Sequence, residues 1–392
     1  MRFWNKLNFI IKRNLPDSKK LSINQLAHYF FVTYRIFWEN TSNKTILKEV
    51  KGINTNFLKK VRTFSWEKAL QSKDEIEKLS ICEAVPSFMI ERLLPVMDLE
   101  FIKDNLKVMN GLVEGDSIAV RINRLLEEDH EKNLDLVIKS ELENLNISFT
   151  KDAHLEDMIT IPRTMKSKVL KSPIYQKGDL IFQDRASAAV VDVLDPQPKE
   201  LICDMCAAPG IKASYIAQKM RNHGKIIAGE FLNPRIRIMI QLLNHLNVIN
   251  THLLNIDSIA FPLRFQNMFD RILLDAPCTG NGTFLTNPEL KWRQNQKFLH
   301  QNTVLQKKLF QSALRLLKPG GILVYSTCSL YPEEGEYIIM NFLNQLEAQN
   351  LPTWFSPSYK TNGSRISGAG RLFPSKQKTQ GFFVGKFKKK AI

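Results

Sequence analysis

Short apolar segments alternate with longer amphipathic ones from about residue 180 onwards, and this alternation restricts the fold more than any other feature. Strands are expected at Leu201–Asp204, Lys225–Gly229, His252–Ile256, Arg271–Asp275 and Ile322–Ser326. Helices are expected at Ile211–Met220, Pro234–Leu246 and Gln301–Leu317, and Lys318-Pro-Gly-Gly321 predicts a stop and a turn after the last one. Because strands that alternate with helices form a parallel sheet covered on both faces, we predict a doubly wound α/β domain.

The chain ahead of this domain predicts two smaller parts. Residues 1–110 are expected to be helical, because segments such as Leu21–Phe37 and Val85–Leu94 carry apolar residues at three- and four-residue spacing. Residues 111–175 predict a small α+β unit, with a helix at Glu127–Leu145 and strands at Ser117–Asn123, Ile147–Phe149 and Met158–Ile161. We therefore expect three units, at residues 1–110, 111–175 and 176–392.

Positive charge is concentrated near both ends of the sequence. The net charge is +16; residues 1–70 hold 14 Lys and Arg against 4 Asp and Glu, and residues 351–392 hold 9 against none. The middle of the chain is therefore close to neutral. Two basic segments favour a nucleic-acid partner, whose phosphates would be contacted by lysine and arginine. A solvated surface and an acidic membrane surface are the alternatives.

Several classes of protein are disfavoured by what the sequence lacks. No apolar run approaches the ~18 residues of a membrane helix, and lysines interrupt the first 20 residues where a signal peptide would be apolar. Five cysteines in 392 residues are too few for a disulfide framework, and a single C-x-x-C pair does not supply four zinc ligands. We expect a cytoplasmic, monomeric protein with no membrane partner and no metal.

Carboxylates follow three of the expected strands, and a turn of small residues follows another. The turn is Asp204-Met-Cys-Ala-Ala-Pro-Gly210, and it lacks the G-x-G-x-x-G pattern of a dinucleotide site. Glu230, Asp257 and Asp275 end the next three strands. A ligand of such a sheet lies beyond the carboxyl ends of the strands, and a carboxylate there suits a ribose diol or a cationic group. The alternative is that each acid only caps a helix.

Two cysteines follow the last two expected parallel strands. Cys278 lies in Asp275-Ala-Pro-Cys278, and Cys328 lies in Ser326-Thr-Cys328. Consecutive strands are commonly neighbours about 4.8 Å apart, so both thiols are expected to face one pocket. A thiolate is a strong soft nucleophile, although free cysteines are often only small buried apolar residues. Their place at strand ends favours the chemical interpretation.

These features resemble the RsmB/Nop/Sun family of RNA 5-methylcytosine methyltransferases over roughly residues 80–392. The resemblance rests on several motifs in the same order: Val120-Arg-Ile-Asn123, Gln183-Asp-Arg-Ala-Ser187, Asp204–Gly210 with Lys212, Asp275-Ala-Pro-Cys-Thr-Gly280, Lys318–Gly321, Tyr325-Ser-Thr-Cys-Ser329, Pro332-Glu-Glu334, Arg371-Leu-Phe-Pro374 and Gly381-Phe-Phe383. It implies a Rossmann-like class I methyltransferase domain preceded by an RRM-like α+β unit. Residues 1–79 resemble only loosely the NusB-like, RNA-binding helical leader of some members.

The resemblance also implies a reaction. Attack of the Cys328 thiolate on C6 of a cytosine would make C5 able to take the methyl of S-adenosylmethionine (SAM). Cys278 would assist release, and Asp275 would bind the cytosine edge. The residues expected to bind SAM are Cys206, Ala207, Ala208, Pro209, Gly210, Ile211, Lys212, Glu230, Arg235, Asp257 and Asp275. The expected partner is RNA, with ribosomal RNA slightly favoured over transfer RNA.

Departures from the family pattern leave other interpretations open. Ile211 and Ala213 stand where the family usually has a glycine and a threonine, and Glu230 stands where it more often has Asp. The bulk of Ile211 motivates one alternative, an RNA-binding or ribosome-assembly factor with weakened catalysis. A DNA cytosine methyltransferase would use Cys278 as the nucleophile instead. A nicotinamide dehydrogenase is disfavoured by the missing glycine pattern.

Overall fold

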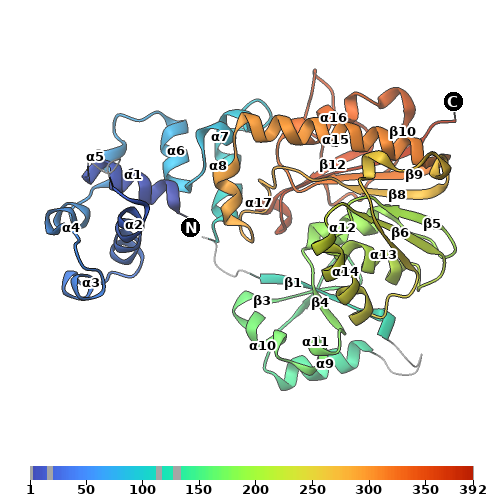
Figure 1. Ribbon diagram of the computed structural model, residues 1–392, viewed down its shortest axis with the longest axis horizontal. Coiled ribbons are helices and arrows are strands. Elements are labelled where there is room, and N and C mark those ends of the chain that lie inside the picture. Colours follow the sequence, from blue (N-terminus) through green and yellow to red (C-terminus); the bar gives the residue numbers. More distant parts are fainter. Residues whose placement is uncertain (1–2, 16–20, 112–116, 127–133, 392) are drawn as a thin grey trace.

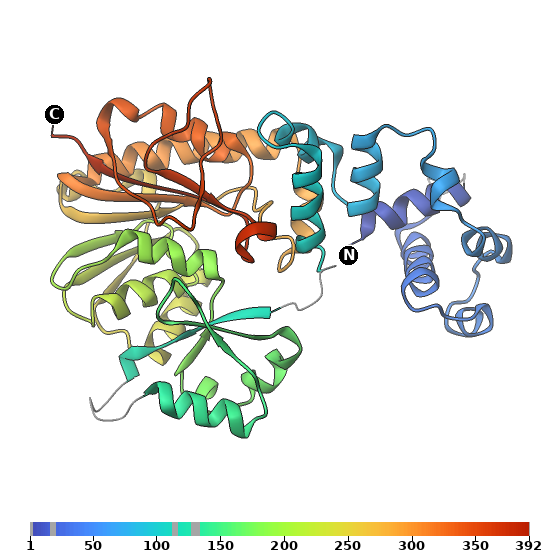
Figure 2. The ribbon, with the colours of Figure 1, turned by 180° about the vertical axis from the view of Figure 1, so that it is seen from behind.

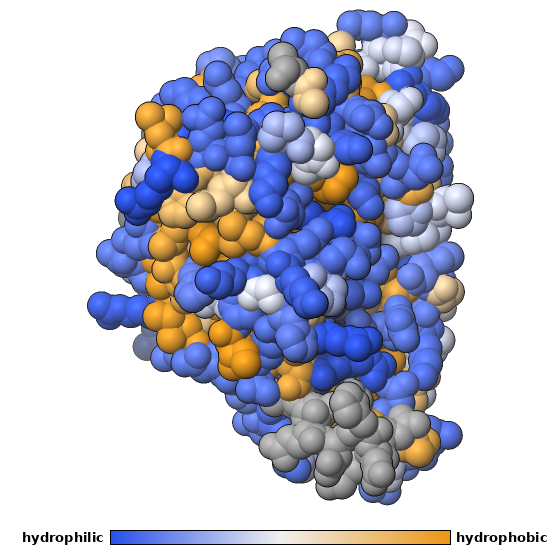
Figure 3. Space-filling view, turned by 90° about the vertical axis from the view of Figure 1, so that its right-hand side faces the viewer, coloured by the Kyte–Doolittle hydropathy of each residue, from blue (hydrophilic) through white to orange (hydrophobic). Residues whose placement is uncertain are grey.

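Three parts make up the molecule: a group of N-terminal helices, a small sheet with its helices, and a large sheet with its helices (Figures 1 and 2). The structure is a computed structural model that describes residues 3–15, 21–111, 117–126 and 134–391. Within these residues, no helix combines the length and the apolar composition that crossing a membrane requires. Figure 3 shows one face of the molecule, on which hydrophilic residues predominate and apolar side chains gather toward one side.

The N-terminal part is helical, as predicted. Its helices are α1 (Trp4–Asn14), α2 (Ile23–Trp38), α3 (Asn43–Glu49), α4 (Thr55–Arg62), α5 (Trp66–Leu70), α6 (Glu75–Glu83), α7 (Ser87–Leu93) and α8 (Leu99–Met109). Short polar side chains cap most of their first turns; Ser22 and Gln25 form a reciprocal capping box at α2. Residues of α1, α2, α3 and α4 share one apolar core, which includes Ile10, Phe30 and Phe57.

Apolar residues of helices α6, α7 and α8 pack against the large domain, although α6 also contacts α1. Their apolar residues form a cluster with Phe284, Tyr331 and Phe373. The ammonium of Lys291, almost fully buried, donates to the Glu83 carbonyl at 3.1 Å. A buried charge with polar partners on another element ties the two elements in one arrangement. This part of the helical region is therefore continuous with the large domain.

The middle part is a four-stranded antiparallel sheet with order β2-β3-β1-β4. Its elements are β1 (Ser117–Ile122), η2 (Arg124–Leu126), α9 (Leu134–Asn144), β2 (Thr150–Lys151), β3 (Met158–Pro162), η3 (Arg163–Met165), α10 (Lys166–Leu170), α11 (Pro173–Gln176) and β4 (Leu180–Phe182). The expected strand at residues 147–149 is wrong, because Asn146 has φ +49° and the Ile147 amide donates to the Leu142 carbonyl, which ends α9. The start of the helix expected from Glu127 lies outside the described residues.

The large sheet confirms the predicted doubly wound architecture. Strands β7-β6-β5-β8-β9 pair in parallel, and β13, β12 and β11 extend the sheet antiparallel, with β10 also on β13. The strands are β5 (Leu201–Asp204), β6 (Lys225–Glu230), β7 (Thr251–Asn255), β8 (Phe269–Asp275), β9 (Leu317–Thr327), β10 (Leu346–Ala348), β11 (Ser356–Pro357), β12 (Ala369–Leu372) and β13 (Phe382–Lys389).

Helices cover both faces of this sheet. One layer consists of α12 (Arg185–Leu194), α13 (Ile211–Lys219) and α14 (Asn233–His245), and it buries residues such as Val190, Ile216 and Leu243. The other consists of α15 (Gln296–Leu316) and α16 (Glu336–Met340), with Phe310 and Ile339 in its core. The remaining short elements are η4 (Ser258–Ala260), η5 (Leu263–Phe265), η6 (Pro288–Arg293), η7 (Pro332–Glu334), η8 (Leu343–Gln345) and α17 (Pro374–Gln377).

The segment Lys318-Pro-Gly-Gly321 differs from its prediction. Helix α15 ends before it, as expected, but β9 already begins at Leu317. Leu317 pairs with Phe269 and Ile322 pairs with Arg271, so the four intervening residues bulge out of the strand instead of forming a separate turn. Gly320 has φ +78°, a conformation that favours glycine.

Candidate active site at the carboxyl ends of the parallel strands

The structure brings the two predicted thiols together. Cys278 follows β8 and Cys328 follows β9, and these strands are parallel neighbours. Their Sγ atoms lie 3.1 Å apart. The hydrogen bond to Cys328 and burial together raise the pKa of the Cys278 thiol well above its ordinary value. Either sulfur can be the donor in this contact. A raised pKa disfavours the thiolate of Cys278, and the thiolate is the nucleophilic form of cysteine, so Cys328 remains the predicted nucleophile.

Asp275 lies at the end of β8, between the thiols and the first loop. One carboxylate oxygen accepts a hydrogen bond from Ser326 Oγ at 2.7 Å, and the other pairs with Lys212 Nζ at 2.7 Å. Burial opposes the charge of Lys212, but the charges of Asp275, Asp204 and Cys328 outweigh it and raise the pKa of Lys212. The site thus holds a fixed carboxylate and a fixed ammonium close to the Cys328 sulfur.

The loop between β5 and α13 contains the residues expected to hold a cofactor. The Ala207 amide donates to the Gly229 carbonyl at 3.0 Å, and the Gly210 amide donates to the Ala207 carbonyl at 2.8 Å. Gly210 has φ +104°, and a Cβ there would lie 2.8 Å from Met239 Cγ. Because both effects disfavour any larger residue, Gly210 is required by the turn itself.

Ile211 follows Gly210 directly. It is the first residue of α13 and packs, partly buried, against the apolar cluster of the α12–α14 layer. Its effect on cofactor binding stays a prediction. Cys206 and Pro209 complete the loop, and burial followed by the nearby Asp204 charge raises the pKa of Cys206 well above its ordinary value. Cys206 is thus a neutral thiol rather than a second nucleophile.

Glu230 and Asp257 have different surroundings. Glu230, at the end of β6, is buried, pairs with Arg235 at 3.0 Å and accepts the Leu232 amide at 2.8 Å. Arg235 also donates to the Ala208 carbonyl at 2.7 Å, which ties the carboxylate to the first loop. Asp257 is exposed and caps η4 by accepting the Ile259 amide at 3.0 Å. The helix-cap interpretation therefore describes the contacts of Asp257, and its role toward a cofactor stays a prediction.

Two buried carboxylates of the site were quoted in motifs but not predicted as site residues. Asp204 ends β5 with 1% of its surface exposed. Among the described residues no side chain donates a hydrogen bond to its carboxylate, and the backbone amide of Cys206 favours its ionised form. Burial raises the pKa of Asp204 to about 7, although the nearby charge of Lys212 partly opposes this shift. The signal that could have found Asp204 was its place at a strand end in line with Glu230 and Asp275.

Glu334 is the second of these carboxylates. It is fully buried, accepts the Thr279 amide at 2.9 Å and Gln306 Nε2 at 3.0 Å, and also contacts the Thr279 hydroxyl. These bonds hold the chain that follows Cys278. The sequence shows Glu334 only as part of Pro332-Glu-Glu334, and its partners are too distant in the sequence to be predicted. Among the described residues, no three His, Cys, Asp or Glu side chains are grouped to hold a metal ion.

Comparison with known proteins identifies related sequences. Residues 191–388 match the family model described as 16S rRNA methyltransferase RsmB/F. A 28S rRNA (cytosine-C(5))-methyltransferase of Mus musculus is 36% identical over 56% of this chain, but the match spans only 29% of its length. A tRNA (cytosine(49)-C(5))-methyltransferase of Pyrococcus abyssi is 37% identical over 55% of this chain and 72% of its own.

A solved structure extends the similarity to nearly the whole chain. The crystal structure of PH0851 superposes with a TM-score of 0.79 at 27% identity and covers 98% of this chain and 88% of that one. The family model matches about half of the chain, and the Pyrococcus abyssi relative is covered over more than two thirds of its length. The chain therefore belongs to the RsmB/F family of methyltransferases.

Proposed function

We propose that this protein methylates C5 of a cytosine in structured RNA, with SAM as the methyl donor. The observation that carries the proposal is the pair of thiols 3.1 Å apart at the ends of adjacent parallel strands, beside Asp275. Relatives that are named for cytosine-C5 methylation of ribosomal and transfer RNA support it. Ribosomal RNA is slightly favoured, because the matching family model is described by a 16S rRNA activity.

The residues at the strand ends fit SAM. SAM supplies an electrophilic methyl group next to a cationic sulfur. The first loop approaches closely at Gly210, and Glu230 presents a buried carboxylate that suits a ribose diol. Asp204 is a buried carboxylate to which no side chain among the described residues donates a hydrogen bond. A ligand that carries an amine and hydroxyl groups would satisfy these acceptors, whereas a pyrophosphate would be repelled by them.

The thiols and Asp275 would carry out the covalent steps on the base. Cys328, whose sulfur lies 3.1 Å from that of Cys278 and near the Lys212 charge, would lose its proton to solvent and attack cytosine C6 as a thiolate. The electron pair of the C5–C6 double bond would then attack the methyl group of SAM, and S-adenosylhomocysteine would leave. Asp275 would accept a hydrogen bond from the N3 and amino edge of the ring and stabilise a proton taken up at N3, which neutralises the negative charge that attack at C6 develops there. A base would then remove the C5 proton, so that the C5–C6 double bond re-forms and the bond from C6 to the Cys328 sulfur breaks, with Cys278 assisting this release.

The target base has to leave its helix to reach thiols that are only partly exposed. Enzymes that act on a base extrude it from the stack, which is easiest in loops and junctions. The basic N-terminal segment, with 14 Lys and Arg in residues 1–70, would bind the surrounding phosphates.

Bisulfite sequencing of total RNA from cells with and without the gene tests the proposal. A single cytosine that loses its protection on deletion would identify both the RNA and the position. A plasmid copy with Cys328→Ala should fail to restore the protection, and a copy with Cys82→Ala, a thiol outside the site, should restore it. If no cytosine changes, the proposed activity is wrong, and the assembly-factor interpretation takes its place.

A further inference from the structure

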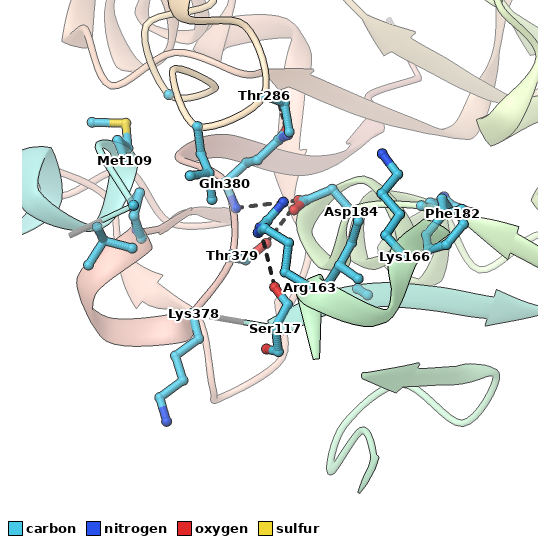
Figure 4. Close-up of a pocket in the computed structure, with 18 of the residues that line it drawn as sticks. Met109, Ser117, Arg163, Lys166, Phe182, Asp184, Thr286, Lys378, Thr379 and Gln380 are labelled. Carbon is cyan, nitrogen blue, oxygen red and sulfur yellow. Dashed lines mark hydrogen bonds between the residues drawn. The ribbon is translucent and has the colours of Figure 1, made fainter. Parts of the chain in front are cut away.

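A cavity of about 390 Å³ lies between the small sheet and the large domain (Figure 4). Its walls come from the end of α8, from β1 and β4, from η3 and α10, from residues 282–286 and from residues 374–380. The volume falls within the roughly 300–1,000 Å³ of pockets that bind small ligands. None of the residues assigned to the cofactor or to the thiol chemistry lines this cavity. It is therefore a separate place for a ligand.

The cavity adjoins the reactive cysteines through the backbone. Gly282, which lines it, donates its amide to the Cys328 carbonyl at 3.0 Å and accepts the Gly381 amide at 2.9 Å. Gln380 Nε2 donates to Thr286 Oγ1 at 3.0 Å across the same wall. One wall of the cavity is thus bonded directly to the nucleophile's own residue. A ligand in the cavity would be a close neighbour of a base held at Cys328.

Positive charge predominates in the lining. Arg163, Lys166 and Lys378 line the cavity, and Lys166 and Lys378 are exposed. The acid among the lining residues is Asp184, and its carboxylate accepts Thr379 Oγ1 at 2.9 Å and the Gln380 amide at 3.4 Å (Figure 4). The Asp184 carboxylate is therefore already hydrogen-bonded within the cavity wall. The exposed Lys166 and Lys378 can contact a phosphate.

Gln183 supplies the second, independent observation. Only 3% of its surface is exposed, it lines the cavity, and its Oε1 has no hydrogen-bond partner among the described residues. Its Nε2 has a long contact of 3.5 Å with Ser187 Oγ. A buried acceptor without a donor is unfavourable, and a small rotation of the Gln183 amide toward the cavity would let a ligand N–H satisfy it. Side-chain amides are a common means of recognising the edges of bases.

We propose that this cavity binds an unstacked nucleotide that flanks the target cytosine in the RNA. Gln183 Oε1 would accept a hydrogen bond from an N–H of its base, while Lys166 and Arg163 would contact its phosphates. The inference rests on the proposed function, because a neighbouring nucleotide requires a target base at Cys328. The inference goes beyond that function, because it locates the preference for RNA sequence at the junction between the small sheet and the catalytic domain. This junction would bind the flanking base while the thiols react with the cytosine.

The test measures binding of single-stranded RNA nonamers by the full chain, using fluorescence anisotropy. Each nonamer carries one central cytosine, and the set varies the base on either side of it. The wild-type protein should prefer some flanking bases, and Gln183→Leu, which keeps the volume, should remove the preference. Lys166→Glu should weaken the affinity for every nonamer about tenfold. Lys166→Ala should reduce the slope of the logarithm of the binding constant against the logarithm of the salt concentration by about one. The matched control is Lys139→Glu on α9 of the same unit, which does not line the cavity.

The outcomes separate the two proposals. SAM binding, measured by calorimetry, should be the same in all variants, since none of these residues belongs to the strand-end site. If the wild-type protein binds the nonamers and the Gln183 and Lys166 variants behave like Lys139→Glu, the cavity proposal is wrong and the proposed function stands. If the wild-type protein neither binds these RNAs nor protects any cytosine in cells, the proposed function fails, and the cavity proposal fails with it.

Discussion

The strand-end site and the cavity beside it meet at residues 278–286, yet they are built in different ways. In the strand-end site the charges are paired and partly or fully buried, as Lys212 is with Asp275 and Arg235 with Glu230. In the cavity, exposed lysines surround a single buried amide, Gln183. Groups fixed by each other in a protected site suit chemistry that needs preorganised charge. Exposed cations suit a flexible polyanion that arrives from solution. The two proposals together therefore predict that reaction and recognition use separate surfaces.

The largest expected effect is at Asp275. Asp275→Asn keeps the shape of the side chain but removes the charge that pairs with Lys212, so kcat for RNA methylation should fall roughly 10²–10³-fold while KM for RNA changes little. The matched control is Asp270→Asn, at the other end of β8, where the carboxylate pairs with Lys318. Equal losses in the two variants would mean that Asp275 acts only through the stability of the strand.

A smaller effect is expected at Glu230. Glu230→Gln removes the charge that Arg235 contacts at 3.0 Å and weakens the carboxylate offered to the cofactor, so calorimetry should show a Kd for SAM about tenfold higher. Glu200→Gln, whose partner Arg271 lies at the opposite end of the sheet, should leave the Kd unchanged. An unchanged Kd in Glu230→Gln would remove this residue from the cofactor site.

The buried Asp204 predicts a pH dependence of stability without ligand. Its pKa is about 7 in the folded chain, above its ordinary value of 3.8. The folded chain therefore keeps a proton that the unfolded chain releases, and the free energy of unfolding should decrease as the pH rises from about 4 to about 7. Asp204→Asn removes this loss and should gain roughly 3–4 kcal/mol relative to the wild type across that range, measured by urea unfolding. Parallel curves for the two proteins would contradict this explanation.

The smallest effect on the cofactor is expected at Ile211. Because its side chain packs against the core, Ile211→Gly should change the Kd for SAM by less than about twofold. The same substitution should lower the free energy of unfolding by about 1–2 kcal/mol, since it removes apolar contacts and places glycine in the first turn of α13. A large gain in SAM affinity would instead restore the weakened-catalysis interpretation.

More of the strand-end site than of the cavity could be predicted from the sequence. The strand ends could be located from the alternation of elements, because parallel neighbours bring Cys278 and Cys328 to one edge whatever the rest of the chain does. The cavity could not, because its walls come from segments far apart in the sequence, and Gln183 looked like one residue of a motif. The position of the helices α6–α8 on the large domain also depends on tertiary contacts, such as that of Lys291 with Glu83, that have no local signal.

Two local differences from the predicted secondary structure also result from contacts that the sequence does not show. The strand expected at residues 147–149 was overridden by the turn at Asn146, and the expected turn at residues 318–321 became a bulge because β8 offers a partner to both sides of it. In each case a neighbouring element decided the outcome. The burial of Asp204 likewise depends on the packing of three strands, so its raised pKa could not be inferred from its motif.

Covalent trapping of RNA tests the central claim most directly. Purified wild-type, Cys328→Ala and Cys278→Ala proteins would be incubated with SAM and radiolabelled RNA that contains the target cytosine, and then separated on a denaturing gel. If Cys328 is the nucleophile and Cys278 assists its release, Cys278→Ala should accumulate an RNA–protein adduct and Cys328→Ala should form none. An adduct in Cys328→Ala that is absent from Cys278→Ala would reverse the roles of the two thiols and contradict the proposed mechanism.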